Sequence, residues 1–408
     1  MTNSHFLEAG VCSRRLENAT GTRLNLHFSA EDIAFRAQAR DWLHEHVPRE
    51  RRPHAGPAAR AYDLAWQALQ YEAGWAGISW PKEYGGLGLS LTRQLIWHEE
   101  YARANAPDHH LCFVALNHAG PTIMANGTVA QKQYHLPRIL KGEVIWCQGF
   151  SEPNAGSDLG SLRTRARVEG DFLVVSGSKI WTSHGHLSEW QELLVRTDAS
   201  AAKHKGISWV ICDMKSPGLT LRPIEIMTSP NQTHFVQCFY DDVRIPLTNV
   251  VGDLNDGWNV AMSTLAFERG TAQIRDQIRY AYLVEEMIAK AVERLGNDCP
   301  LSRDEIGVRL ADLRADMAAA RAMTYMVVSR ADAGMRGSEA SLMRALVGET
   351  QQRARRLALD ILGPYALENP EEDDWVYFYL RSFSITIAAG TAQIQRNIIG
   401  ERVLGLPR

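Results

Sequence analysis

The stretch of sequence that decides the fold is WCQGFSEPNAGSDLGS, residues 146–161. It begins like a short apolar strand, continues into hydroxyl side chains and ends in a turn rich in Pro, Asn and Gly. A strand that ends in this way presents backbone N–H groups and hydroxyls at the edge of a sheet, where they suit the polar rim of a planar heterocycle. An ordinary Asn-Ala-Gly turn between two strands is the alternative interpretation.

Similar short segments surround this stretch and predict a small β-barrel or sandwich. They are rich in Val, Ile, Phe, Trp and Thr, and Gly, Asp, Asn or Pro separates them at intervals of about 8 to 12 residues. The predicted strands lie at residues 144–151, 164–169, 171–176, 192–197, 207–213, 219–226 and 235–245.

Helical patterns flank the strands on both sides. Residues 29–47 carry apolar side chains at helical spacing, Ser29 and Asp32 match a capping box, and Pro48 ends the segment. Helical patterns continue over residues 62–143 and resume at Gly257, and the long segments 303–334 and 338–362 are typical of a helical bundle. We therefore predict a mainly helical α+β protein, divided into a polar extension (1–27), a helical N-terminal domain (28–143), a central β domain (144–250) and a C-terminal helical bundle (251–408).

Composition and charge exclude several classes of protein. The net charge of −3 predicts no binding to nucleic acid or to anionic membranes. No apolar run approaches the length of about 18 to 20 residues that crosses a bilayer, and the N-terminus has no secretory pattern. The 6 cysteines are scattered, which is typical of reduced thiols in a cytosolic protein. His109-His110 and His184-Gly185-His186 have no third ligand at a recognisable spacing, so we predict no metal site. Rossmann and P-loop motifs are also absent.

Two further stretches carry candidate chemistry, GSKIWTS at residues 177–183 and AAGTAQIQR at residues 388–396. Together with residues 146–161, they resemble signatures of the acyl-CoA dehydrogenase family, and the resemblance runs over residues 28–408. It implies a C-terminal four-helix bundle and FAD bound between this bundle and the β domain.

The resemblance also implies which residues bind FAD. In this family the Trp of the second stretch stacks on the flavin, and here that residue is Trp181. By position, the other candidates on the three stretches are Gln148, Phe150, Ser151, Ser157, Thr182, Ser183, Gly390, Thr391 and Gln393.

A weaker match, at residues 360–363, resembles the segment through which a neighbouring subunit contacts the adenylate half of FAD. It adds Asp360 and Gly363 to the candidates, but Asp360 replaces a usual Gln and Pro364 replaces a usual Gly. The family's Arg-x-x-Phe-Gly segment has no clear counterpart over residues 290–305. The contacts between subunits at the cofactor are therefore left open.

Ala389 stands where the best-known members carry their catalytic glutamate, directly before the Gly-Thr. Dehydrogenation needs a carboxylate that removes the α-proton and hydrogen-bond donors for the thioester carbonyl. In the family one donor is the backbone N–H at the Ala389 position, which Ala389 keeps. Glu268, directly before Arg269, matches the position at which isovaleryl-CoA-type members carry their glutamate. The resemblance thus implies Glu268 as the base and Arg269 beside the substrate. A solvated glutamate and a structural salt bridge are the alternatives.

The function implied is the oxidation of an acyl-CoA thioester to the trans-2-enoyl-CoA, with flavin N5 taking the β-hydride and an electron-transfer flavoprotein receiving the electrons. The family also implies a cytoplasmic homodimer or homotetramer in fatty acid metabolism, with a heteromer as the alternative assembly. The small Ala389 suggests a pocket for branched or ring-bearing acyl groups. Two other functions stay open, a flavin monooxygenase on the same fold and a structural subunit of a heteromeric dehydrogenase.

Overall fold

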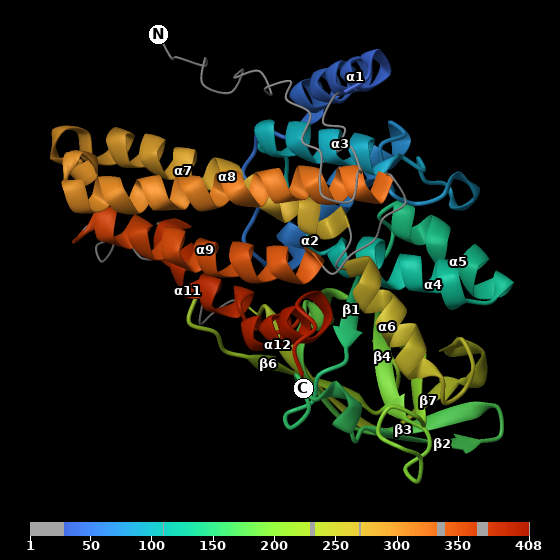
Figure 1. The fold of residues 1–408 in the computed structure, drawn as a ribbon. Coiled ribbons are helices and arrows are strands. Elements are labelled where there is room, and N and C mark those ends of the chain that lie inside the picture. Colours follow the sequence, from blue (N-terminus) through green and yellow to red (C-terminus); the bar gives the residue numbers. More distant parts are fainter. Residues whose placement is uncertain are drawn as a thin grey trace.

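The computed structural model describes residues 28–108, 110–228, 233–268, 271–332, 339–364 and 374–407. Along the chain a group of helices is followed by a sheet and then by a second, longer group of helices (Figure 1). The sheet lies below the N-terminal helices in Figure 1, and the long C-terminal helices extend to one side. This arrangement confirms the predicted α+β fold class, whereas the division at residues 143/144 and 250/251 stays a prediction.

The first N-terminal helix begins where the sequence predicts a helix start. Ser29 caps the first helix, since its hydroxyl accepts a hydrogen bond from the Asp32 N–H at 3.1 Å and the Asp32 carboxylate accepts one from the Ser29 N–H at 3.1 Å. The helix ends at His46, two residues before Pro48, because the residue before a proline disfavours helical geometry. The helices in this part are α1 (Ala30–His46), α2 (Gly56–Glu72), α3 (Leu91–Arg103), α4 (Gly120–Asn126) and α5 (Val129–Leu140), with a π-helical turn η2 (Ala115–Ala119).

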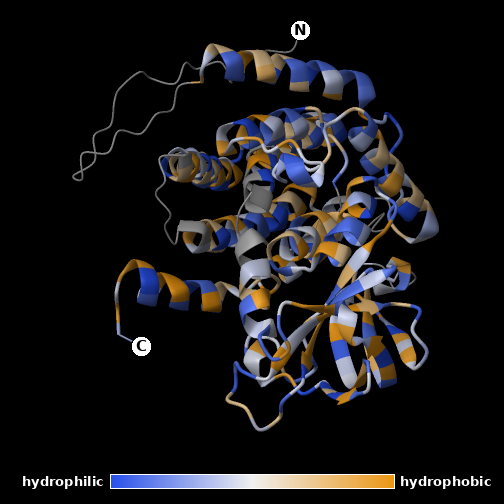
Figure 2. Ribbon diagram, turned by 90° about the vertical axis from the view of Figure 1, so that its right-hand side faces the viewer, coloured by the Kyte–Doolittle hydropathy of each residue, from blue (hydrophilic) through white to orange (hydrophobic). Residues whose placement is uncertain are grey.

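The C-terminal helices form the bundle. They are α6 (Gly257–Glu268), α7 (Thr271–Leu295), α8 (Asp304–Asp332), α9 (Glu339–Leu362), α11 (Asp374–Ile385) and α12 (Ala392–Ile398), followed by the π-helical turn η8 (Ile399–Val403). Figure 2 shows α12 and η8 projecting from the body of the molecule toward the C-terminus. Val403, Leu404 and Leu406 on this projection are 41%, 65% and 55% exposed.

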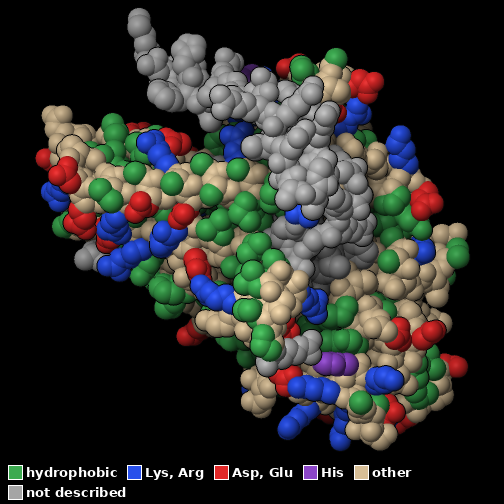
Figure 3. All heavy atoms as spheres, in the orientation of Figure 1, with side chains coloured by type: hydrophobic (Ala, Val, Ile, Leu, Met, Phe, Trp, Pro, Cys, Tyr) green, Lys and Arg blue, Asp and Glu red, His purple; other side chains and the backbone are tan. Residues whose placement is uncertain are grey.

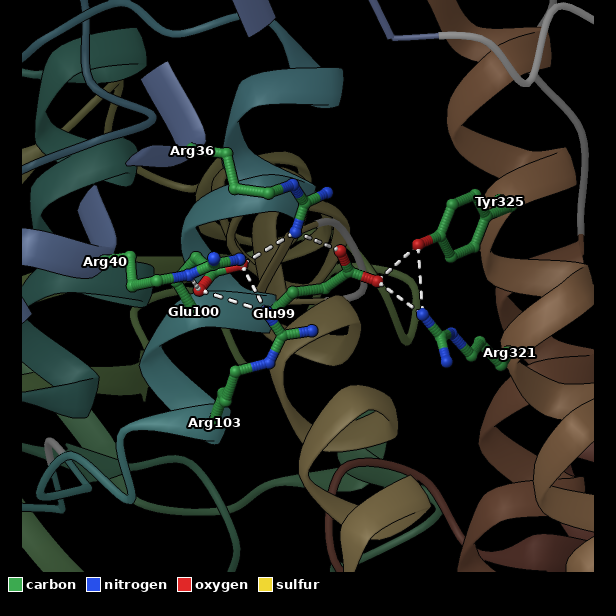
Figure 4. Close-up of polar contacts among 7 residues, drawn as sticks. All are labelled: Arg36, Arg40, Glu99, Glu100, Arg103, Arg321 and Tyr325. Atoms are coloured by element: carbon green, nitrogen blue, oxygen red, sulfur yellow. Dashed lines mark hydrogen bonds and ion pairs between the residues drawn. The ribbon is translucent and has the colours of Figure 1, made fainter. Parts of the chain in front are cut away.

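A buried acidic pair joins the N-terminal helices to the bundle (Figure 4). Glu99 and Glu100 on α3 are almost fully buried. On the α1 side, Arg36 Nη1 lies 2.8 Å from a carboxylate oxygen of each glutamate, and Arg40 Nε lies 2.8 Å from Glu100 Oε2. On the bundle side, Arg321 of α8 lies 3.1 Å from Glu99 Oε1. Charge-assisted hydrogen bonds therefore fix α1, α3 and α8 relative to one another.

Within the described residues, eight strands form a single sheet. They run along the sheet in the order β6-β7-β3-β2-β4-β5-β8, and β1 pairs in parallel with β4. The strands are β1 (Trp146–Gly149), β2 (Arg165–Glu169), β3 (Phe172–Ser183), β4 (Trp190–Arg196), β5 (Ile207–Asp213), β6 (Leu219–Ile224), β7 (Phe235–Pro246) and β8 (Val250–Val251).

The third strand differs from its prediction, because β3 does not end near residue 176 but continues to Ser183. Its pairing with β7 shifts twice, between Val175 and Gly177 and between Lys179 and Thr182. Gly177 has a φ of +147° and lies so close to Thr164 that a Cβ there would meet its Cα at 2.7 Å. Such irregularities bend a strand and re-aim its side chains, and the second one lies at Trp181.

Close packing also positions α6 against the sheet. A Cβ on Gly257, the first residue of α6, would lie 2.3 Å from the Trp209 nitrogen on β5. Only glycine permits this approach of helix and strand backbones. Trp80, Trp146 and Trp209 are fully buried in the core between the sheet and the N-terminal helices.

No helix in the described part of the chain has both the length and the apolar character needed to cross a membrane. Likewise, the described His, Cys, Asp and Glu side chains include no group of three placed to hold a metal ion. The described cysteines are free thiols. On the face drawn in Figure 3, basic and acidic side chains intermingle over the long helices, in line with the small net charge of −3.

Candidate functional site

A buried ion pair joins the turn after β1 to the end of β3. Lys179 is fully buried, and its Nζ donates to Glu152 Oε1 at 2.9 Å and to the Phe150 carbonyl at 3.0 Å. The Glu152 carboxylate also accepts from the backbone N–H groups of Arg163 at 2.7 Å and Thr164 at 2.8 Å. Burial alone would raise the pKa of Glu152, but the Lys179 charge and these hydrogen bonds outweigh it and lower the pKa. Burial lowers the pKa of Lys179 to about 8, although the Glu152 charge opposes this effect, so both groups are charged at neutral pH and the pair holds residues 150–164 against β3.

Trp181 lies beside this ion pair and faces outward. The Ile180 N–H donates to the Ser151 carbonyl at 2.9 Å, so two of the predicted motifs meet directly before Trp181. Trp181 has a φ of +60° and remains 56% exposed. Its ring packs edge-on against Phe235 of β7, with centroids 5.9 Å apart. A left-handed backbone is strained for a tryptophan, and such strain is concentrated at ligand sites.

Gln148 on β1 belongs to a polar group that it forms with the buried His118 and Glu192. Its Nε2 donates to Glu192 Oε1 at 2.8 Å and lies 3.3 Å from His118 Nδ1, which in turn is 3.2 Å from Glu192 Oε1. The other candidates on these two stretches differ in exposure: Phe150 and Thr182 are buried, Ser151 and Ser183 are half-buried, and Ser157 is exposed.

The turn at Ala389 is held by the bundle. Arg344 of α9 donates to the carbonyls of Ile385 at 2.6 Å and Ala388 at 2.8 Å. Ala389 has a φ of +55°, and within the described residues its N–H has no hydrogen-bond acceptor. Gly390 follows with a φ of +88°. The turn thus presents an N–H donor next to a side chain too small to obstruct a ligand.

The helix after this turn begins at Ala392. Thr391 caps α12, with its hydroxyl accepting from the Ile394 N–H at 3.2 Å. The buried Gln395 donates to the carbonyls of Ala389 and Gly390, both at 3.4 Å. Gln393 is exposed on the opposite side of this short helix.

Asp360 lies in the last turn of α9, and Gly363 directly follows this helix. Asp360 pairs with Arg309 of α8 at 2.6 Å and with Arg356 at 3.2 Å, so its charge is satisfied within the chain. Gly363 ends the helix with a φ of +56°. Their predicted contact with the cofactor of another subunit stays a prediction.

The two charged residues proposed for catalysis receive no structural test. Glu268 is the last residue of α6, and its side chain lies outside the described part of the chain. Arg269 also lies outside it.

Sequence reasoning missed the residues that connect the bundle to Trp181. Arg381 of α11 places its guanidinium carbon 5.9 Å from the centre of the Phe235 ring. His234 packs edge-on against the same ring with centroids 4.5 Å apart, and His184 packs against His234 at 4.3 Å. Only the clustered histidines stood out in the sequence, because the contacts join positions far apart along the chain.

The group around Trp181 fits a bound flavin. A planar aromatic ring packs well on an exposed indole. Ser183 follows Trp181 by two residues on β3, and Ser151 is joined to Ile180 through its carbonyl. Both serines are half-buried, and their hydroxyls could donate to the polar edge of such a ring.

Three family models match the chain in order. They are Acyl-CoA dehydrogenase, N-terminal domain at residues 29–143, Acyl-CoA dehydrogenase, middle domain at residues 147–243, and Acyl-CoA dehydrogenase, C-terminal domain at residues 255–404.

Individual relatives agree with these matches. Acyl-CoA dehydrogenase IpdE1 of Mycobacterium tuberculosis is 38% identical over 388 residues, which cover 92% of this chain and 97% of the relative. Among solved structures, the Tcur3481-Tcur3483 steroid ACAD is 30% identical with a TM-score of 0.81, and the match covers 94% of this chain and 100% of that one. A chain of the ChsE4-ChsE5 complex from Mycobacterium tuberculosis is 31% identical with a TM-score of 0.79. This match covers 94% of this chain and 100% of that one.

Proposed function

This chain belongs to the acyl-CoA dehydrogenase family, and from that premise we propose that it oxidises a bulky acyl-CoA thioester to the 2-enoyl-CoA, with Glu268 as the base. Enzymes of this family are FAD-dependent oxidoreductases that act on CH–CH groups. The observation that carries the proposal is Trp181, which is 56% exposed in a strained conformation at the meeting point of two motifs. When bound there, the flavin supplies the acceptor for the β-hydride.

Residues of this chain stabilise the thioester carbonyl, hold the turn that carries the donor and remove the α-proton. The N–H of Ala389, which has no acceptor among the described residues, donates to the thioester carbonyl and stabilises the negative charge that develops there. Arg344 and Gln395 hold this turn from two sides, which fixes the donor before the substrate arrives. Glu268 removes the α-proton. Support for this role is its place at the end of α6, directly before Arg269, in the register of the family members whose base lies on this helix.

The acyl group is the second part of the proposal. A methyl group at Ala389 occupies much less space than a glutamate side chain, which leaves room near the α-carbon for a branched or ring-bearing chain. The solved relative named as a steroid ACAD is similar to this chain over 94% of its length, which supports a ring-bearing substrate.

Assembly and electron transfer complete the proposal. The exposed Val403, Leu404 and Leu406 project from the body and are suited to pack against another subunit. The partner is either a second copy of this chain or a homologous subunit, as in the ChsE4-ChsE5 complex. An electron-transfer flavoprotein is the proposed electron acceptor.

Replacement of Glu268 tests the assignment of the base. We expect Glu268→Gln to lower turnover with an artificial electron acceptor by about 10²- to 10⁴-fold, the usual contribution of a general base, while FAD content stays the same. Glu293→Gln, at an exposed position on α7, is the matched control and should leave turnover unchanged. Full turnover in Glu268→Gln would overturn this role.

A further inference from the structure

Arg381 on α11 is a half-buried arginine without a carboxylate partner among the described residues. Three similarly buried arginines, Arg36, Arg52 and Arg60, each have a carboxylate oxygen within 2.8 Å. Burial lowers the pKa of the Arg381 guanidinium, an effect that Tyr377 and Tyr280 oppose, but a guanidinium still keeps its proton at neutral pH. The protein therefore holds a poorly solvated positive charge at this position, and such a charge is unfavourable unless an anion binds beside it.

The positive charge of Arg381 lies beside Phe235, the ring that packs against Trp181. The Arg381 guanidinium packs over the Phe235 ring at 5.9 Å, and the same ring packs edge-on against Trp181, also at 5.9 Å, and against His234 at 4.5 Å. A ligand that covers Trp181 and extends along Phe235 would therefore bring its next group toward Arg381.

The neighbouring histidines add no second charge. Burial, assisted by Arg381, lowers the pKa of His234 to about 3. Burial and the adjacent His234 lower the pKa of His184 well below its usual value. Both rings are neutral at physiological pH, so Arg381 is the charged group of this cluster.

We propose that Arg381, packed on Phe235 beside Trp181, binds the diphosphate of the dinucleotide cofactor. This inference rests on the proposed function, since it places the flavin ring on Trp181. A guanidinium is suited to the role because its planar fork donates two hydrogen bonds to one phosphate. The ribityl chain of FAD links the ring to a diphosphate, which supplies the missing anion. The diphosphate of CoA has the same chemistry and is the alternative source.

Titration of the apoprotein with FAD and with riboflavin tests the proposal, because riboflavin has the ring but no phosphate. We expect Arg381→Gln to weaken FAD binding by about 10- to 100-fold, as for the loss of a charged hydrogen bond, and to leave riboflavin binding unchanged. Arg381→Lys, which keeps the charge but loses the fork, should recover part of the FAD affinity. Arg222→Gln is the matched control, since Arg222 also packs over a phenylalanine of β7, Phe239, but is exposed to solvent.

Thermal unfolding separates binding from a structural role. Because Arg381→Gln removes an unpaired buried charge, the midpoint of the apoprotein should not fall, whereas its increase on addition of FAD should shrink. A lower thermal midpoint of the Arg381→Gln apoprotein would show that Arg381 supports the fold and would overturn the proposal. An equal loss of affinity for FAD and for riboflavin would overturn it in the same way.

Two further outcomes are distinguishable. Unchanged FAD affinity in Arg381→Gln would overturn the Arg381 inference alone, and weakened binding of CoA to the same variant would then assign the charge to the thioester ligand. A wild-type apoprotein that binds neither FAD nor riboflavin would overturn the proposed function together with this inference.

Discussion

Replacement of Lys179 by methionine tests whether the buried ion pair holds the cofactor-side turn. Methionine fills a similar volume but cannot donate the two hydrogen bonds of Lys179 Nζ, at 2.9 Å to Glu152 and 3.0 Å to Phe150. Removal of one partner of a buried pair usually destabilises a protein by about 3–5 kcal/mol. Glu152 keeps two backbone donors, from Arg163 and Thr164, so we expect a value at the lower end, about 3 kcal/mol.

Urea denaturation of the purified protein measures this loss. Glu152→Gln in the Lys179→Met background should recover part of it, because the unpaired charge is gone. The recovery is incomplete, since the Arg163 and Thr164 N–H groups donate to different carboxylate oxygens and an amide keeps only one of these acceptors. Lys141→Met is the matched control, since Lys141 and Glu143 form an exposed pair at 3.9 Å. A loss below about 1 kcal/mol in Lys179→Met would refute the reasoning. No recovery in the double variant would show that packing, and not the unpaired carboxylate, causes the loss.

Three other predictions concern the Ala389 turn and the acidic pair. Ala389→Met should lower turnover of ring-bearing thioesters more than that of straight-chain ones; an equal effect in kcat/KM on both classes would contradict the pocket. Gly390→Ala should destabilise the protein by about 1–3 kcal/mol in urea denaturation, because φ is +88° and the new Cβ would lie 2.5 Å from Gln395 Nε2; an unchanged midpoint would contradict it. Burial alone would raise the pKa of Glu100, but hydrogen bonds led by Arg40 outweigh it and lower the pKa, so this stabilisation is full above about pH 4.3 and is lost as the pH falls further. Glu100→Gln should therefore lower the thermal midpoint at pH 7 more than at pH 3, and a parallel shift at both would contradict this.

Local signals were sufficient to predict much of the fold. The capping box at Ser29 and the proline at residue 48 bound α1 correctly, because both act within a few residues of the helix end. The strand that carries Trp181 was predicted too short, since its continuation depends on pairing with β7 across a register shift. Such pairing is a property of two distant segments and leaves no local pattern.

Only those candidate site residues that lie within a contiguous sequence motif could be predicted from the sequence. Trp181 and the Ala389 turn were identified from contiguous stretches, and the structure adds that both have a strained backbone. The ion pair of Glu152 with Lys179 and the packing of Arg381 on Phe235 arise from side chains that meet only in the folded chain. No spacing in the sequence predicts either contact.

The most direct test of the central claim is the visible spectrum of the purified protein, recorded without oxygen before and after addition of acyl-CoA thioesters. We predict a yellow protein whose flavin absorbance is bleached by a ring-bearing or branched thioester, with the bleaching abolished in Glu268→Gln. A yellow protein that no thioester bleaches would contradict the account.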